Sequence, residues 1–290
     1  MSLLLALMLQ VGPFSGGIEQ PASPLPQEIR DRKARPNRTG GATVTDADTP
    51  PRLRECLAAA EDTPANALAN ARTWRGRANG PARADADQCM GVAYGNLGLW
   101  AEAEGAFLSA RDTIPAEDRA RRGALSAMAG NAALATGASA RALALLDLAR
   151  TDAAAAERDM LVGGIELDRA RALVALERTD EAKTALETAR TIDPGNADAW
   201  LLSATLSRRQ GQLAGAQQQI EKAAGLAPLD PETGLEAGVI AMLAGREDAA
   251  RRSWQSVIAT VPQSPQAETA RGYLAQLNDP VEPAPKLAKP

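Results

Sequence analysis

The sequence repeats itself every 34 residues between positions 197 and 262. Four residues of one unit return in the next in the same order, as Gly211 and Gly245, Ala216 and Ala250, Ile220 and Trp254, and Pro228 and Pro262. On each side of Gly211 the apolar and small residues follow the spacing of one helix face, and Trp200 lies on the first of these faces. Each unit therefore predicts two short helices joined at a glycine and ended by a proline. Units of this size stack on one another, because one helix pair cannot bury its apolar face alone.

An earlier segment carries the same pattern more completely. Its key positions, in order, are Gly91, Tyr94, Gly98, Ala103, Phe107, Ala110 and Pro115. The small residues let two helices cross closely, the aromatic rings fill the space between them, and the central glycine permits the tight turn. These positions resemble the tetratricopeptide repeat (TPR) consensus.

The resemblance to TPR proteins covers roughly residues 52–277 and implies an all-α fold. We expect a right-handed α-solenoid of about five to six repeats, with a C-terminal capping helix over Pro265–Leu277. In the middle repeats the turn positions Gly98, Gly137 and Glu177 are 39 and 40 residues apart, which predicts longer first helices. These include the lead-ins Asp118–Arg122 and Ala155–Asp159.

The chain divides into four segments by composition. Residues 1–17 contain an apolar run of about ten residues, too short to span a membrane and typical of an export signal. An apolar N-terminus without this role, or a wrongly chosen start codon, are the alternatives. Residues 18–50 are predicted to be a disordered linker, 51–277 the TPR solenoid, and 278–290 a disordered proline-rich tail.

The composition argues against several classes of function. The formal net charge of −4 and pI near 5.2 do not favour a nucleic-acid partner. The absence of histidine removes the usual catalytic triads and histidine-ligated zinc. No nucleotide-binding or nucleophile motif is present, so we expect no enzyme activity, cofactor, metal or small-molecule substrate. The charged residues Glu166, Asp168, Arg169 and Arg171 are expected to form exposed ion pairs along a helix, not a catalytic dyad.

The two cysteines are expected to form a disulfide. The TPR resemblance places Cys56 at the ninth position of one first helix and Cys89 at the sixth position of the next, and these positions are neighbours in TPR stacks. A disulfide also agrees with an exported protein. Two buried free thiols are the alternative.

The resemblance also predicts a binding groove lined by the first helices. Its candidate residues are Gln88, Val92, Asn96, Asn131, Arg171, Leu201, Thr205, Arg208, Val239 and Met242. This mixture of apolar and polar groups suits an extended peptide or a partner helix, although some of the residues could instead pack against neighbouring repeats. The Lys and Asn set of TPR chaperone adaptors is missing, which disfavours that subclass.

These observations favour a protein-binding scaffold. The leading hypothesis is a periplasmic or secreted adaptor in a bacterial envelope assembly. A cytoplasmic adaptor or regulator with reduced cysteines is a second hypothesis. The substrate-recognition subunit of an enzyme complex is a third.

Overall fold

The computed structural model describes residues 49–278, and within them every regular element is an α-helix. The export signal, the linker before residue 49 and the tail after residue 278, all expected from the sequence, lie outside the described residues. The helices are α2 (Pro51–Asp62), α3 (Pro64–Arg75), α4 (Pro81–Asn96), α5 (Trp100–Thr113), α6 (Arg119–Ala135), α7 (Ser139–Ala155), α8 (Asp159–Ala175), α9 (Thr179–Ile192), α10 (Ala197–Arg209), α11 (Leu213–Leu226), α12 (Pro231–Leu243), α13 (Glu247–Thr260) and α14 (Pro265–Asn278).

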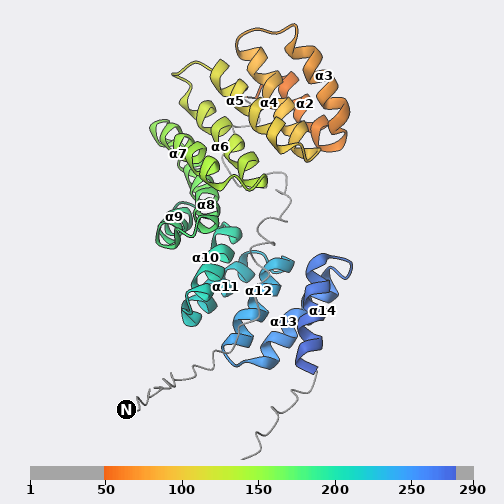
Figure 1. The fold of residues 1–290 in the computed structure, drawn as a ribbon, viewed down its shortest axis with the longest axis vertical. Coiled ribbons are helices and arrows are strands. Elements are labelled where there is room, and N and C mark those ends of the chain that lie inside the picture. Colours follow the sequence, from red (N-terminus) through yellow and green to blue (C-terminus); the bar gives the residue numbers. More distant parts are fainter. Residues whose placement is uncertain (1–48, 279–290) are drawn as a thin grey trace, which may run out of the picture. The chain divides into compact units, whose positions relative to one another are not determined.

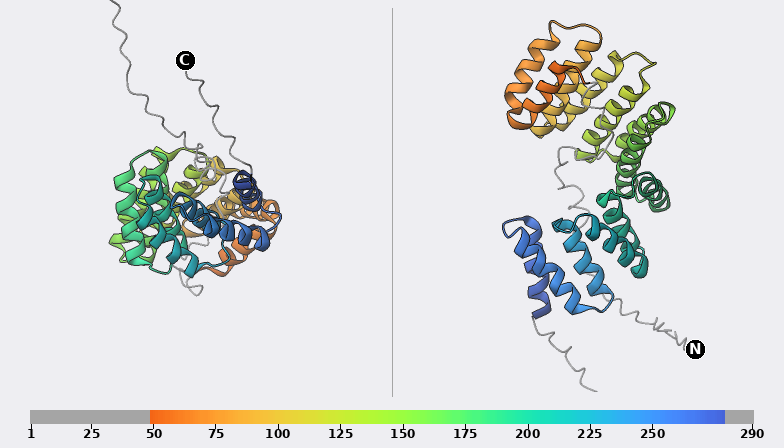
Figure 2. Two further views of the ribbon diagram at one scale, coloured as in Figure 1. Left: turned by 90° about the horizontal axis from the view of Figure 1, so that it is seen from below. Right: turned by 180° about the vertical axis from the view of Figure 1, so that it is seen from behind.

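The helices form six consecutive pairs, α2–α3 to α12–α13, followed by the single helix α14 (Figure 1). Each helix packs mainly against its neighbours in the sequence, and first helices of successive pairs also touch, as α2 touches α4 (Figure 2). The predicted all-α solenoid with a C-terminal capping helix is confirmed. The outer face of α14 is polar, with Glu268, Arg271 and Gln276 exposed.

The turn inside each pair has one recurring geometry. Gly98, Gly137, Gly211 and Gly245 have φ between 72° and 77°, in the left-handed region that glycine tolerates best. The residue after each turn glycine donates its amide to a carbonyl in the last turn of the first helix, as Leu99 does to Tyr94 at 2.9 Å. Glu177 takes this left-handed conformation without being glycine, with φ of 60°.

The extra length of the middle repeats lies in three helices. First helices α6 and α8 have 17 residues each, whereas α10 and α12 have 13. The second helix α7 also has 17 residues, whereas α9, α11 and α13 have 14. The sequence-based assignment of Ala155 to a first helix is wrong, because α7 continues through Ala155 and ends in a left-handed residue, Glu157.

The core of each repeat pairs a small residue on the first helix with a large one 16 residues later. The pairs are Gly91 with Phe107, Gly130 with Leu146, Ala170 with Leu186, Ala204 with Ile220, and Gly238 with Trp254. A Cβ atom at Gly91 would lie 2.5 Å from the Phe107 ring, and one at Gly238 would lie 2.1 Å from Nε1 of Trp254. The largest fillers therefore fit only because glycine faces them. Gly238 has no counterpart among the residues that the sequence singled out.

The junctions between the first five repeats share an arginine contact. An arginine near the end of the second helix reaches the fourth position of the next first helix. The contacts are Arg75 to Asp87, Arg111 to Ser126 at 2.7 Å, Arg150 to Glu166 at 3.5 Å, and Arg190 over the Trp200 ring at 4.7 Å. At the next junction these two positions carry Ala224 and Gly234 instead. We call this set the junction arginines.

Candidate partner-binding face

The polar residues predicted to line a groove lie where successive first helices meet. Gln88 on α4 accepts a hydrogen bond from Arg121 on α6 at 3.3 Å. Asn96 at the end of α4 donates to the carbonyl of Ala60 on α2 at 2.8 Å. Each side chain therefore connects one repeat to the next while remaining partly or fully accessible.

The next two junctions follow the same plan. Asn131 on α6 donates to the carboxylate of Asp168 on α8 at 2.8 Å, and Arg171 on α8 donates to Asp198 on α10 at 3.2 Å. Arg171 also bonds Asp168 on its own helix. Asp168 is 4% exposed, so its charge is matched by a cation and an amide and not by water.

Arg208 on α10 holds Glu236 on α12 with two hydrogen bonds, at 2.6 and 3.3 Å. The Glu236 and Arg208 side chains are 7% and 8% exposed, so this is the most enclosed ion pair between first helices within residues 49–278. Such pairs cost desolvation energy when formed and leave an uncompensated charge when one partner is removed. Their clear contribution here is to define how α10 and α12 meet.

The remaining predicted groove residues divide by burial. Leu201 and Thr205 are only 5% and 7% exposed, so they contribute to the interior of the fold. Val92, Val239 and Met242 are half-buried and pack at the edges of the neighbouring hydrophobic clusters. These three leave apolar surface available to a ligand on the first helices.

The sequence reasoning did not single out Leu243, which is 48% exposed at the end of α12. It lies directly after Met242, and together they place two apolar side chains at the end of one first helix. The available signal was its register, because the adjacent thirteenth position carries Asn96 in the second repeat.

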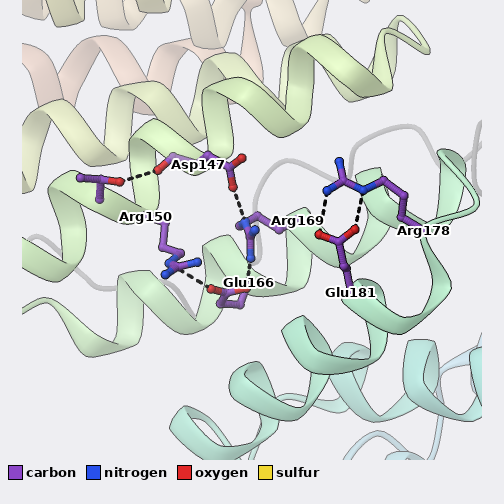
Figure 3. Close-up of polar contacts among 7 residues, drawn as sticks. Asp147, Arg150, Glu166, Arg169, Arg178 and Glu181 are labelled. Atoms are coloured by element: carbon purple, nitrogen blue, oxygen red, sulfur yellow. Dashed lines mark hydrogen bonds and ion pairs between the residues drawn. The ribbon is translucent and has the colours of Figure 1, made fainter.

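The prediction of exposed ion pairs around Glu166 is wrong about burial. Glu166 is 4% exposed and bonds Arg169 at 2.6 Å, while Arg169 reaches Asp147 on α7 at 2.7 Å (Figure 3). Burial opposes the charge of Arg169, but its two carboxylate partners outweigh this effect and raise its pKa. The cluster joins α7 to α8 because these helices pack face to face, which helix spacing alone does not reveal.

A second pair in Figure 3 lies at the start of α9. Arg178 donates two hydrogen bonds to Glu181, at 2.6 and 2.7 Å. The hydrogen bond from Arg178 lowers the pKa of the Glu181 carboxyl. Both side chains are substantially exposed, so the pair contributes little to the stability of the fold.

Cys56 on α2 and Cys89 on α4 form a disulfide, with their Cα atoms 6.0 Å apart. Counted within the repeat, the bond occupies the same two positions as the hydrogen bond between Asn131 and Asp168. The first junction thus carries a covalent link where a later junction carries a polar contact.

The described residues contain no group of three or more metal-ligating side chains. Within residues 49–278, none of the helices combines the length and hydropathy needed to cross a bilayer. The geometry that remains is a series of first helices joined by polar contacts, with apolar side chains such as Met242 between them.

The comparison with protein families decides what these pairs are. Residues 173–233 match the model of the tetratricopeptide repeat, a segment that begins within α8 and ends within α12. The chain carries tetratricopeptide repeats. The match includes Glu177, so a non-glycine turn does not remove the TPR pattern.

Solved TPR structures share the fold. PilW, described as a widely conserved type IV pilus biogenesis factor, matches with a TM-score of 0.62 and 17% identity, covering 77% of this chain and 100% of PilW. Pseudomonas aeruginosa PilF matches with a TM-score of 0.54 and 14% identity over 77% of this chain and 99% of PilF. TTC0263, a TPR protein of Thermus thermophilus, matches with a TM-score of 0.54 and 20% identity over 67% of this chain and 99% of TTC0263. No curated protein matches the sequence.

Proposed function

We propose that this TPR protein is a non-enzymatic scaffold that binds a protein partner through its first helices. The observation that carries the proposal is the series of six helix pairs, whose first helices keep half-buried apolar residues between the polar contacts. Surfaces of this kind suit an extended peptide or a partner helix, which offers apolar anchors at regular intervals. Met242 and Leu243 are the most accessible apolar residues of this face on α12.

We further propose that the scaffold works in the bacterial envelope, in the periplasm or as a secreted protein. The disulfide between Cys56 and Cys89 supports this location, because such bonds persist in oxidising compartments. The similarity to PilW and PilF supports it through their names, which refer to type IV pilus biogenesis and to a pil protein of P. aeruginosa. The partner in this proposal is a protein, with no nucleic acid and no small-molecule substrate.

The test is an affinity purification with the whole chain as bait, from an envelope extract of the native organism. Bound proteins are identified by mass spectrometry for the native chain, for Leu243→Glu and for the matched control Ala259→Glu. Leu243 is exposed on a first helix and Ala259 is exposed on the second helix α13, so neither substitution disturbs the core. A partner retained by the native chain and the control, but lost from Leu243→Glu, supports the proposal. Identical recovery in all three samples, or no recovery above an unrelated acidic protein, contradicts it.

A further inference from the structure

A cleft lies between the second helices α3 and α5, with the first helix α4 as its floor. These three helices are consecutive neighbours in Figure 1. The cleft has a volume of about 270 Å³. Its walls are formed by Arg75, Asp87, Met90, Tyr94, Glu102, Gly105, Ala106 and Ser109. It is distinct from the residues of the first-helix face described above.

The cleft is open because a small residue stands where the next repeat has a large one. Ala106 and Leu145 occupy the same position, three residues after the core alanines Ala103 and Ala142. Leu145 packs against the hydrophobic clusters of both the second and the third repeat. Ala106 belongs to no such cluster and lines the cleft instead. The fold therefore fills this site with a leucine side chain in one repeat and leaves it unfilled in the preceding one.

The neighbouring position adds room at the wall. A Cβ atom placed on Gly105 would meet no other atom within 4 Å. Met90 and Tyr94, both half-buried, supply apolar surface on the floor. Methionine adapts its shape to neighbouring groups, and an aromatic ring offers a flat apolar wall.

The charges at the cleft are unequal. Asp87 is 1% exposed, and its two oxygens accept hydrogen bonds from Arg75 and from Ser109, the latter at 2.8 Å. This carboxylate is therefore matched inside the protein. Glu102 is exposed and has no ion pair among the residues that the structure describes. A ligand with a positive charge beside its apolar group complements this arrangement.

We propose that the cleft between α3 and α5 receives an apolar side chain of leucine size from a partner protein, next to a basic residue that pairs with Glu102. The occupant is inferred from the chain itself, because Leu145 fills the equivalent site one repeat later. This second docking point goes beyond the first-helix face and does not depend on it. A partner that uses both surfaces gains affinity from linking two contacts in one chain.

The test uses the dipeptide acetyl-Leu-Lys-amide as probe and the full chain labelled with ¹³C at its methionine methyl groups. We expect a saturable change in the NMR shift of the Met90 methyl group, because this residue lines the cleft. Acetyl-Ala-Lys-amide should change that shift far less at the same concentration, since it lacks the side chain that fills the site. Equal effects of the two dipeptides would overturn the proposal.

Three variants locate the binding. Ala106→Leu supplies the missing side chain from within and should abolish the change at Met90. Gly105→Leu should do the same from the open wall, and it does not require any rearrangement of the core if Ala106→Leu fails to fold. Ala144→Leu places the same substitution at the register of Gly105 in the next repeat and should leave probe binding unchanged. Probe binding that survives in folded Gly105→Leu, or is lost in Ala144→Leu, refutes the assignment. A pull-down that fails at Leu243 while the probe still binds separates this proposal from the proposed function.

Discussion

At the scale of single residues, the distance between the two helices of a repeat depends on one small residue and one large one. Phe107 and Trp254 face glycines, whereas Ile220 and Leu186 face alanines. The backbone spacing can stay similar between repeats because the loss of one methyl group on the first helix compensates for a larger ring on the second. Close packing makes each such pair sensitive to a change in volume.

Trp254→Ala should lower the free energy of unfolding of the C-terminal repeats by about 3–5 kcal/mol. Trp254 is 3% exposed, and its Nε1 donates to the carbonyl of Leu235 at 3.2 Å. Hydrogen exchange of the amides in α12, α13 and α14 measures this loss locally, which suits a repeat protein whose parts can open separately. The exposed neighbour Gln255→Ala should leave exchange unchanged. Unchanged protection in Trp254→Ala would show that the tryptophan does not support the last repeats.

Glu177→Gly should stabilise the protein by about 0.5–1 kcal/mol. A left-handed conformation costs a residue with a Cβ roughly 1–2 kcal/mol, and the greater freedom of glycine in the unfolded chain removes part of this gain. Glu177 has φ of 60° and is exposed, so no packing is lost. Glu177→Ala is the control and should show no gain. The midpoint of urea unfolding measures both variants, and a lower midpoint for the glycine variant would contradict the argument.

At the scale of helices, the junction arginines show how one repeat is attached to the next. The same arginine position meets a carboxylate at Asp87 and Glu166, a hydroxyl at Ser126 and an aromatic face at Trp200. A guanidinium group suits all three, since it donates several hydrogen bonds and also stacks on rings. Arg190, which stacks on Trp200, has a lowered pKa because burial disfavours its charge.

Arg75→Ala should lower the free energy of unfolding by roughly 2–3 kcal/mol. Removing one partner of a buried pair costs about 3–5 kcal/mol, and the effect is smaller here because the Arg75 side chain is 37% exposed. Adding Asp87→Asn to this variant should restore part of the loss, since the uncompensated buried charge is then absent. Chemical denaturation of the two single variants and the double variant measures the coupling. Equal losses in Arg75→Ala and in the exposed control Arg77→Ala would show that the contact contributes nothing.

At the scale of the whole chain, the disulfide ties the first repeat to the second. Cys56 and Cys89 close a loop with a sequence separation of 33 residues. In the chain-entropy model a loop of this size stabilises the folded state by roughly 3.5–4 kcal/mol. The first repeat benefits most, because α2 buries only Leu53 and Ala60 completely.

Protein isolated from its native compartment and alkylated without reductant should carry no modified cysteine. After reduction, both thiols should react, and amides of α2 and α3 should exchange faster because the covalent link to α4 is lost. A Cys56→Ser, Cys89→Ser variant is the matched control and should exchange equally fast with and without reductant. Mass spectrometry reads both experiments. Two alkylated cysteines in the untreated native sample would contradict the disulfide and weaken the proposed periplasmic location.

The sequence by itself determined the helix pairs, their turns and the core positions. Gly211 and Gly245, Ala216 and Ala250, and the recurring prolines are local signals, because turns, close helix crossings and helix ends each demand particular residue types. The same periodicity was enough to place Cys56 and Cys89 on neighbouring first helices.

Only the tertiary structure decided which side chains face a ligand and which face the next repeat. Asn131, Arg171 and Arg208 have the register of groove residues, yet each bonds a carboxylate on another first helix. The cleft beside Ala106 likewise exists only because the side chain that would fill it is missing from a neighbouring helix. Such contacts join residues far apart in the sequence, and their partners are set by how the helices pack. Helix periodicity reports the face of a helix but not what lies against it.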